Sequence, residues 1–169
     1  MKSKDSLRAP ELLTEEHEVS GFGCGKPPLN QYLKKYARVN QANEISRTYV
    51  ATRGLRVVGY YTLTFGSVSH DEATAKIKAE LPQYPLPIIL LARLAVDQKE
   101  AGKGLGKGLL KDALLRTVQA ADIAGLRAML THAKDEEAKQ FYLKFGFEES
   151  PIQPLTLMLS IKDIRASLL

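Results

Sequence analysis

The spacing of apolar residues predicts an amphipathic helix near the start of the chain. Between residues 27 and 43, Pro28 lies near the expected first turn, and Lys34, Lys35 and Arg38 occupy the outer side. The apolar side chains recur at helical intervals, at Leu29, Tyr32, Leu33, Tyr36 and Ala37. We therefore expect the helix to bury this apolar face and to expose a basic one.

Extended segments follow this helix. The stretches "SRTYVAT" and "RVVGYYTLTFGSVS" are rich in β-branched and aromatic residues, and "RGL" separates them, so we expect an antiparallel hairpin. Further on, "IILLARLAVD" is apolar on both faces and predicts a central strand.

The remaining pattern alternates helices and strands. It predicts a polar helical piece at residues 71–80 and, after the central strand, a helix from about Gly104 to Ile123. A strand in "LRAMLTH", a helix in "DEEAKQFYLKFG" and a strand in "LTLMLSI" follow, and a short helix ends the chain. The fold class is therefore α/β, with an antiparallel first half and a βαβ-like second half. Nothing in the 169 residues calls for a second domain, and we expect residues 1–169 to form one.

Composition limits the chemistry. The single cysteine, Cys24, excludes an internal disulfide, and the three histidines share no metal-ligand spacing with it, so we expect no metal site. The net charge of +5 favours polyanionic partners such as nucleic acid or a nucleotide cofactor. With no apolar run of membrane-spanning length and no secretory signal at the start, we expect a cytoplasmic protein without membrane contact.

The motif "GKGLGKG" at residues 102–108 lies between the predicted central strand and the following helix. Such a glycine-rich helix entrance predicts a phosphate site, because glycines let backbone N–H groups approach an anion and the helix N-terminus adds positive potential. A P-loop needs Ser or Thr after its lysine, but Gly108 follows Lys107. A Rossmann fingerprint needs the spacing G-x-G-x-x-G, which is not present.

The chain resembles the GNAT N-acetyltransferases, and in particular the GNAT-type toxins of bacterial toxin-antitoxin pairs. The resemblance covers most of residues 10–161 and is carried by six blocks: "FGCGKPPLNQYLKKYARVNQ", "SRTYVA", "YYTLTFGSVS", "LPQYPLPIILLARLAVD", "GKGLGKGLLKDAL" and "HAKDEEAKQFYLKFGF". It implies a single-domain GNAT fold whose mixed sheet has an antiparallel N-terminal part and splayed central strands, flanked by helices. It also implies acetyl-CoA as the acetyl donor.

The resemblance implies where the cofactor binds. The pantetheine arm would pair with the backbone of Leu94, Ala95 and Val96, as a ligand that adds to a strand. The pyrophosphate would bind the backbone of the glycine motif, at Ala101, Gly102, Lys103, Gly104, Leu105, Gly106 and Lys107, and Asp135 and Phe141 would lie near the cofactor. The family usually has Gln or Arg where this chain has Ala101, so we expect weaker cofactor binding at worst.

Tyr142 matches the tyrosine that similar enzymes use as general acid. A phenol with a pKa of about 10 stays protonated at neutral pH and can donate to a departing thiolate. The alternative is a purely structural aromatic cluster with Phe141, Phe145 and Phe147. Asp135 is most simply a helix N-cap, His132 a strand-end histidine with a satisfied partner, and Cys24 a small group near a turn rather than a nucleophile.

No residue stands out as a strong base, and this favours an α-amine, which is largely neutral at cellular pH, over a lysine side chain. The similar toxins acetylate the α-amino group of aminoacyl-tRNA. Basic residues available for the tRNA phosphates are Arg93, Lys34, Lys35, Arg38, Arg47, Arg53 and Arg56, although each has a simpler interpretation as a solvated surface group. Arg93 lies inside an apolar strand, which predicts either a ligand or an internal ion pair.

Three functions stay open at this point. The first is an aminoacyl-tRNA acetylating toxin that forms a homodimer and is held inactive by a ribbon-helix-helix antitoxin, as the resemblance implies. The second is a GNAT enzyme that acetylates a small amine or a protein N-terminus. The third is a CoA-binding module without turnover, which Ala101 favours and Tyr142 opposes.

Overall fold

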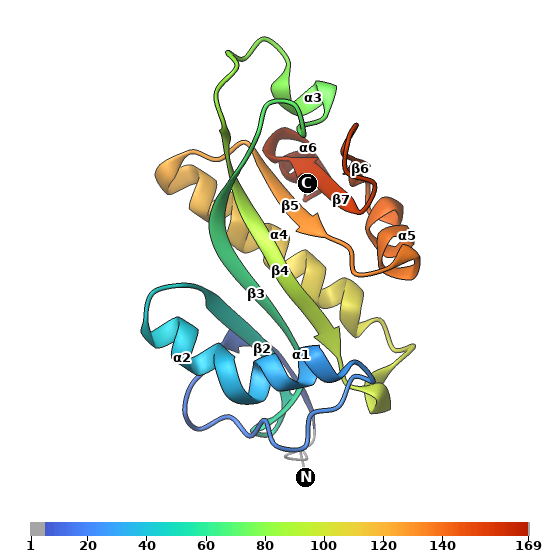
Figure 1. Ribbon diagram of the computed structural model, residues 1–169. Coiled ribbons are helices and arrows are strands. Elements are labelled where there is room, and N and C mark those ends of the chain that lie inside the picture. Colours follow the sequence, from blue (N-terminus) through green and yellow to red (C-terminus); the bar gives the residue numbers. More distant parts are fainter. Residues whose placement is uncertain (1–5, 169) are drawn as a thin grey trace. The chain divides into compact units, whose positions relative to one another are not determined.

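The computed structural model describes residues 6–168, which fall into two compact units (Figure 1). The first unit holds the chain up to Thr64 together with Ala92–Ala113, and the second holds Phe65–Leu91 and the chain from Leu114. Strands β3 (Arg56–Val68) and β4 (Leu86–Val96) and helix α4 (Leu105–Ala124) contribute to both units. That residues 1–169 form a single domain stays a prediction.

The strands form one mixed sheet in the order β1-β2-β3-β4-β5-β7-β6. Besides β3 and β4 these are β1 (Leu7–Leu12), β2 (Arg47–Arg53), β5 (Ala128–His132), β6 (Glu148–Glu149) and β7 (Thr156–Ser160). The predicted β2–β3 hairpin is antiparallel, β4 is the central strand, and β4 runs parallel to β5. The two edge strands were not predicted. β1 is largely exposed and contains Pro10, and β6 has only two residues, so neither shows a strand pattern.

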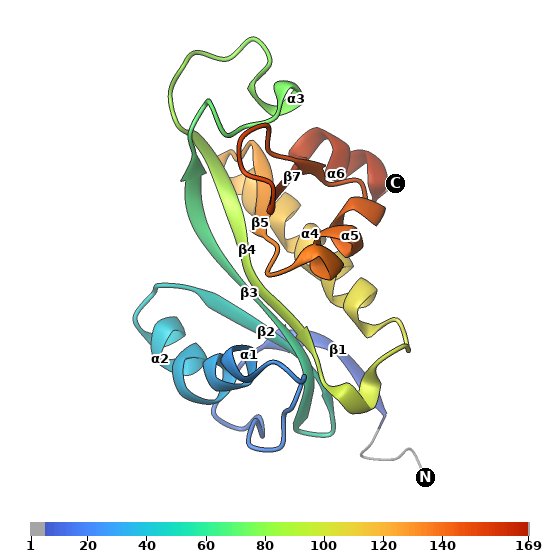
Figure 2. The same ribbon diagram turned by 45° about the vertical axis from the view of Figure 1, so that its right-hand side comes forward.

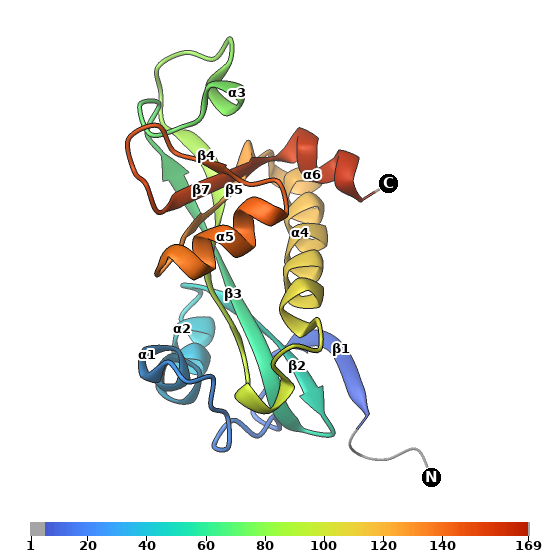
Figure 3. The ribbon, with the colours of Figure 1, turned by 90° about the vertical axis from the view of Figure 1, so that its right-hand side faces the viewer.

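In the first unit, a helical segment packs on one side of the hairpin. It consists of α1 (Pro27–Gln31), the π-helical turn η1 (Tyr32–Tyr36) and α2 (Ala37–Ala42). Its buried residues join the core around Val50 and Tyr60. Figure 3 shows α1 and α2 on one side of β3 and the first turns of α4 on the other.

The π-helical turn corrects one prediction. Tyr36 was expected on the buried face of the helix, but its side chain is 53% exposed, while Tyr32 and Ala37 are buried. A π-turn holds more residues than an α-turn and therefore rotates the following side chains around the axis. The strict 3.6-residue period used for the sequence does not allow for this rotation, and it misplaces Tyr36.

In the second unit, short helices alternate with the strands. They are α3 (Ala75–Lys78), α5 (Glu136–Lys144) and α6 (Ile161–Ser167). The predicted helix at residues 71–80 is shorter than expected, because Thr74 caps its start and Glu80 has a φ of 61° just beyond its end. Within residues 6–168, no helix combines the length and the apolar character needed to cross a bilayer.

Candidate active site

The glycine motif forms an open loop between β4 and α4. After β4 comes a short 3-10 turn, η2 (Gln98–Glu100), and the loop then enters α4 (Figure 2). Gly102 and Gly104 have φ values of 78° and 81°, which favour glycine, and a Cβ at either position would meet no atom within 4 Å. The loop is exposed, and the first N–H groups of α4 have no partner inside the helix. An anion therefore has room to bind here.

Two buried carboxylates hold the start of this loop. Asp97, 3% exposed, accepts hydrogen bonds from the backbone N–H groups of Gly23 at 3.1 Å and Lys99 at 2.9 Å. Glu100, 5% exposed, accepts two bonds from the Arg53 guanidinium, at 3.0 and 2.9 Å. The Arg53 contact holds the pKa of Glu100 below its ordinary value. Arg53, considered above for tRNA phosphates, therefore has an internal partner that positions the loop.

Strand β3 sets the distance of α4 from the sheet. A Cβ at Gly59 would lie 3.0 Å from Leu109 and 3.1 Å from Leu105, so glycine lets the first turns of α4 come close. Two residues further along the strand, the Tyr61 hydroxyl donates to the carboxylate of Asp112 on α4. These contacts hold the first turns of α4 against β3, while the loop before the helix stays open.

The predicted pantetheine residues lie beyond the end of the β4–β5 pairing. The pairs run from Ile88↔Ala128 to Leu91↔Thr131, and β4 then continues to Val96. Within the described residues, the segment from Leu94 to Val96 therefore has no partner in β5. Ala95 is buried and its two neighbours are half-buried. The β4–β5 pairing therefore ends before the segment that the resemblance assigns to the pantetheine arm, and the role of that segment stays a prediction.

Tyr142 is buried on α5. Its ring packs against Phe141 and Phe147, with centroid distances of 5.2 and 5.3 Å. Burial raises the pKa of the Tyr142 hydroxyl, and a hydrogen bond with the Thr131 side chain opposes this. Thr131 in turn donates to the Leu91 carbonyl at 2.9 Å. The ring thus packs as in a structural aromatic cluster, and burial keeps its hydroxyl protonated, as a general acid requires.

Asp135, His132 and Cys24 make local hydrogen bonds. Asp135 caps α5 by accepting from the Ala138 N–H at 2.8 Å, as predicted. His132 contacts the Thr156 hydroxyl through Nδ1 at 2.9 Å, so the strand-end interpretation is confirmed. The half-buried Cys24 thiol donates to the Lys26 carbonyl at 3.6 Å. Among residues 6–168, no three His, Cys, Asp or Glu side chains are arranged to hold a metal ion.

Arg93 has a partner that the sequence did not suggest. Its guanidinium carbon lies 3.7 Å from the centroid of the Tyr32 ring. In the described part of the chain we find no carboxylate paired with Arg93, so of the two alternatives the ion pair is not observed there, and contact with a ligand stays a prediction. A cation–π contact with a buried tyrosine instead stabilises this charge inside an apolar strand.

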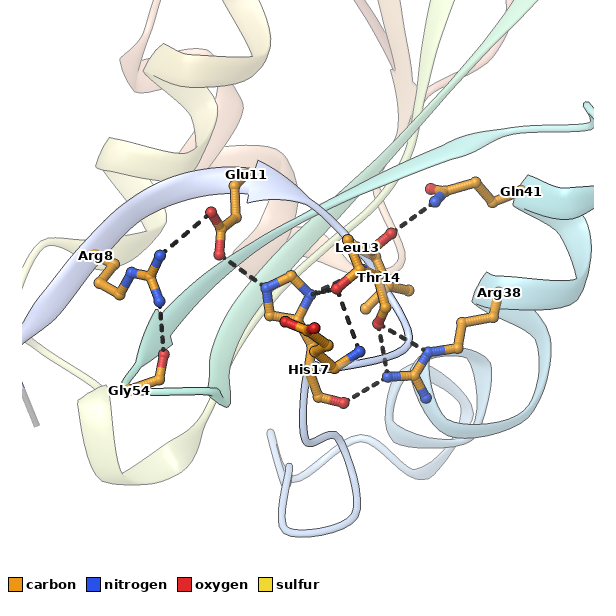
Figure 4. Close-up of polar contacts among 9 residues, drawn as sticks. Arg8, Glu11, Leu13, Thr14, His17, Arg38, Gln41 and Gly54 are labelled. Atoms are coloured by element: carbon orange, nitrogen blue, oxygen red, sulfur yellow. Dashed lines mark hydrogen bonds and ion pairs between the residues drawn. The ribbon is translucent and has the colours of Figure 1, made fainter. Parts of the chain in front are cut away.

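The other predicted basic residues divide into two groups. Lys34 and Lys35 are exposed on η1. Arg38 instead points at the loop after β1 and donates to the carbonyls of Thr14 at 3.0 Å and His17 at 2.5 Å (Figure 4). Arg47 donates to Glu44 at 2.6 Å and to the Gln41 carbonyl at 3.1 Å. The two arginines therefore support the fold locally, and only the lysines present unoccupied charge on this helix.

A histidine network missed by the sequence analysis supports the same loop. His17, 6% exposed, accepts the Thr14 N–H at Nδ1 (2.9 Å), so its proton is assigned to Nε2, which donates to Glu11 at 2.8 Å (Figure 4). Glu11 also pairs with Arg8 at 3.6 Å. Local sequence gives no sign of this network, because its members lie on a strand and a loop without periodic pattern.

Comparison with known proteins places these features in a family. The family model described as Acetyltransferase (GNAT) domain matches residues 44–149. A tRNA-acetylating toxin of Mycobacterium tuberculosis (strain ATCC 25618 / H37Rv) is 50% identical over 158 residues, which are 94% of this chain and 95% of the toxin.

Solved structures agree with this match. AtaT complexed with acetyl-methionyl-tRNAfMet superposes with a TM-score of 0.89 at 26% identity, over 97% of this chain and all of that one. A mutant AtaT toxin bound to the C-terminus of the antitoxin AtaR and acetyl-CoA gives 0.81 at 28% identity, over 96% and 98% of the two chains. The chain therefore belongs to the GNAT acetyltransferase family, and it is an acetyl-CoA-dependent acyltransferase.

Proposed function

We propose that this protein transfers the acetyl group of acetyl-CoA to the α-amino group of aminoacyl-tRNA and so inhibits translation. The observation that carries the proposal is the 50% identity, over almost the full length of both chains, to a tRNA-acetylating toxin. The likeness to AtaT, solved in complex with acetyl-methionyl-tRNAfMet, supports the same substrate class.

The described residues fit the cofactor that the family uses. In this proposal the backbone N–H groups from Ala101 to Lys107 bind the pyrophosphate, because the loop is open and its glycines allow a close approach. The backbone from Leu94 to Val96 pairs with the pantetheine arm, and Phe141 and Asp135 lie near it. Bound acetyl-CoA supplies an acetyl group activated as a thioester.

Two groups of this chain act on the reaction. A backbone N–H of the Leu94–Val96 segment stabilises negative charge on the thioester oxygen while the amine nitrogen forms the new C–N bond. The C–S bond then breaks, and the Tyr142 hydroxyl donates its proton to the departing sulfur. The α-amine needs no strong base, because a substantial part of it is neutral at cellular pH, and once the C–N bond has formed the acidic nitrogen loses its extra proton to water.

The substrate and partners follow from the same proposal. Lys34 and Lys35 contact tRNA phosphates, and Arg93 on β4 adds a third positive charge. Arg38 and Arg47 contribute less, because Glu15 and Glu44 partly neutralise them. The protein acts in the cytoplasm as a homodimer and is neutralised by an antitoxin with a ribbon-helix-helix domain. The AtaT complex with AtaR supports the antitoxin partner.

A direct assay tests the substrate. Purified protein is incubated with labelled acetyl-CoA and total charged tRNA, beside free amino acids and a polyamine. We expect label on aminoacyl-tRNA, released by mild alkali as an N-acetyl amino acid. If label reached only the polyamine or the free amino acids, the protein would be a small-amine acetyltransferase and the tRNA proposal would be wrong.

Substituting Gly104 by alanine tests the phosphate loop. Its φ of 81° costs an L-residue about 1–2 kcal/mol, so the loop should change shape and the Kd for acetyl-CoA should rise about tenfold. Calorimetric titration with acetyl-CoA measures this. Gly108→Ala is the matched control, because Gly108 lies within α4, where alanine is favoured. Equal affinities of the two variants would place the pyrophosphate elsewhere.

A further inference from the structure

Tyr36 has an unusual environment for a large aromatic side chain. It is 53% exposed at the end of the π-helical turn, and its exposed neighbours on the same segment are Lys34, Lys35 and Val39. π-turns are frequent at functional sites. An α-helical turn at this place would have directed Tyr36 toward the core, so the irregular turn is what presents the ring to solvent.

The Tyr36 ring lies next to the Tyr32 ring, which in turn lies against the Arg93 guanidinium. The Arg93 guanidinium lies over Tyr32, and the Tyr32 ring lies 6.5 Å from the Tyr36 ring with an angle of 32° between their planes. Tyr32 is itself held firmly, since it is 5% exposed and its hydroxyl bonds to Ser46 at 3.2 Å. Tyr36 therefore has a fixed aromatic neighbour on its inner side and is accessible on its outer side.

The surrounding charge favours nucleic acid over protein as the partner of this surface. Residues 27–42 contain no Asp or Glu, and the two lysines next to Tyr36 are exposed. Lysine is depleted in the centres of protein interfaces. An aromatic ring beside cationic groups is, in contrast, the usual arrangement for an unpaired base and its phosphates.

We infer that Tyr36 stacks on an unpaired base at the single-stranded acceptor end of the RNA substrate, with Lys34 and Lys35 contacting adjacent phosphates. This inference rests on the proposed function for the identity of the RNA. It adds a residue that reads the single-stranded end through its π-face, which every base offers, so the contact gives affinity for the end without a base preference.

Three variants test the inference. Tyr36→Ala removes the ring, Tyr36→Phe keeps the stacking surface, and Tyr84→Ala is a control at a tyrosine that is 70% exposed in the second unit. We expect Tyr36→Ala to weaken binding of deacylated tRNA roughly 5- to 150-fold, the range for loss of one stacked base, and the other two variants to bind like wild type. Filter binding measures the affinity.

The contact is located with a shortened RNA. On tRNA lacking its unpaired 3′ nucleotides, Tyr36→Ala and wild type should bind equally, because the stacked base is missing from both. An equal loss on full and shortened tRNA would overturn the inference. So would unchanged tRNA binding, or a loss of self-association in sedimentation without a loss of RNA affinity, which would make Tyr36 a protein contact.

The binding assay separates this inference from the proposed function. If wild type binds tRNA in a Tyr36-dependent way but does not acetylate charged tRNA, the contact stands and the acetylation proposal fails. If wild type acetylates charged tRNA and Tyr36→Ala has the same KM as wild type, the acetylation proposal stands and the contact is wrong.

Discussion

Tyr142→Phe lowers the rate of acetyl transfer by about 10²–10⁴-fold, the usual contribution of a positioned general acid. The substitution removes one oxygen and keeps the ring that packs against Phe141 and Phe147. The Kd for acetyl-CoA should therefore stay close to wild type, and the loss should fall on kcat. Single-turnover rates with labelled acetyl-CoA, beside calorimetric binding, separate the two quantities.

The pH dependence gives a second measure of the same residue. Because burial raises the pKa of Tyr142, the hydroxyl stays protonated beyond the pH at which an exposed phenol ionises. The wild-type rate should therefore show no decline from loss of this proton until the solution is more alkaline than the ordinary pKa of about 10. Tyr142→Phe should show no such decline at all. A variant with wild-type kcat would leave Tyr142 as a packing residue only.

Arg53→Ala lowers the free energy of unfolding by about 3 kcal/mol at neutral pH, the lower end for breaking a buried ion pair. It leaves the buried Glu100 carboxylate without its bidentate partner, at the start of the phosphate loop. The loop should loosen as well, and the Kd for acetyl-CoA should rise. Urea unfolding and calorimetric titration measure the two effects.

Acid should reduce the difference between Arg53→Ala and wild type. The folded pKa of Glu100 is lowered, chiefly by the Arg53 hydrogen bonds, so the pair contributes stability above the unfolded pKa and loses it as the pH falls through the folded pKa. In the variant, Glu100 keeps only the Lys103 ammonium at 3.7 Å, so its protonation removes a poorly paired charge. Lys111→Ala, at an exposed cation on α4 in the same unit, is the matched control, expected within about 0.5 kcal/mol of wild type. A pH-independent loss, or equal effects of both substitutions, would contradict the role of the ion pair.

Features that depend on short stretches of chain could be predicted from the sequence. The turn "RGL" between two β-branched runs led to the β2–β3 hairpin, and the apolar run at residues 88–97 to the central strand. Asp135 was placed correctly as a helix cap, since a cap needs only the next three residues. The glycine motif indicated a phosphate site, the family resemblance added acetyl-CoA and the role of Tyr142, and these functional roles stay predictions.

Features that depend on distant partners could not be predicted. Arg53 and Glu100 are 47 residues apart. The ring that Arg93 contacts is that of Tyr32, which precedes the β2–β3 hairpin in the sequence, whereas Arg93 follows it. Both arginines were candidates for RNA contacts, and the fold gives each an internal partner that the sequence did not reveal. Likewise, β1 has too few buried positions to show a strand pattern, and only its pairing with β2 defines it.

By itself, the sequence determined the order and type of most elements, the open glycine loop and the family, because periodicity, turn residues and motifs act over a few residues. Only the tertiary structure decided which charges are available to a substrate. It committed Arg38, Arg47 and Arg53 to internal contacts and left Lys34 and Lys35 exposed. It also moved Tyr36 to the surface through a π-turn, since the exposure of a side chain depends on how its helix packs against residues far away in the sequence.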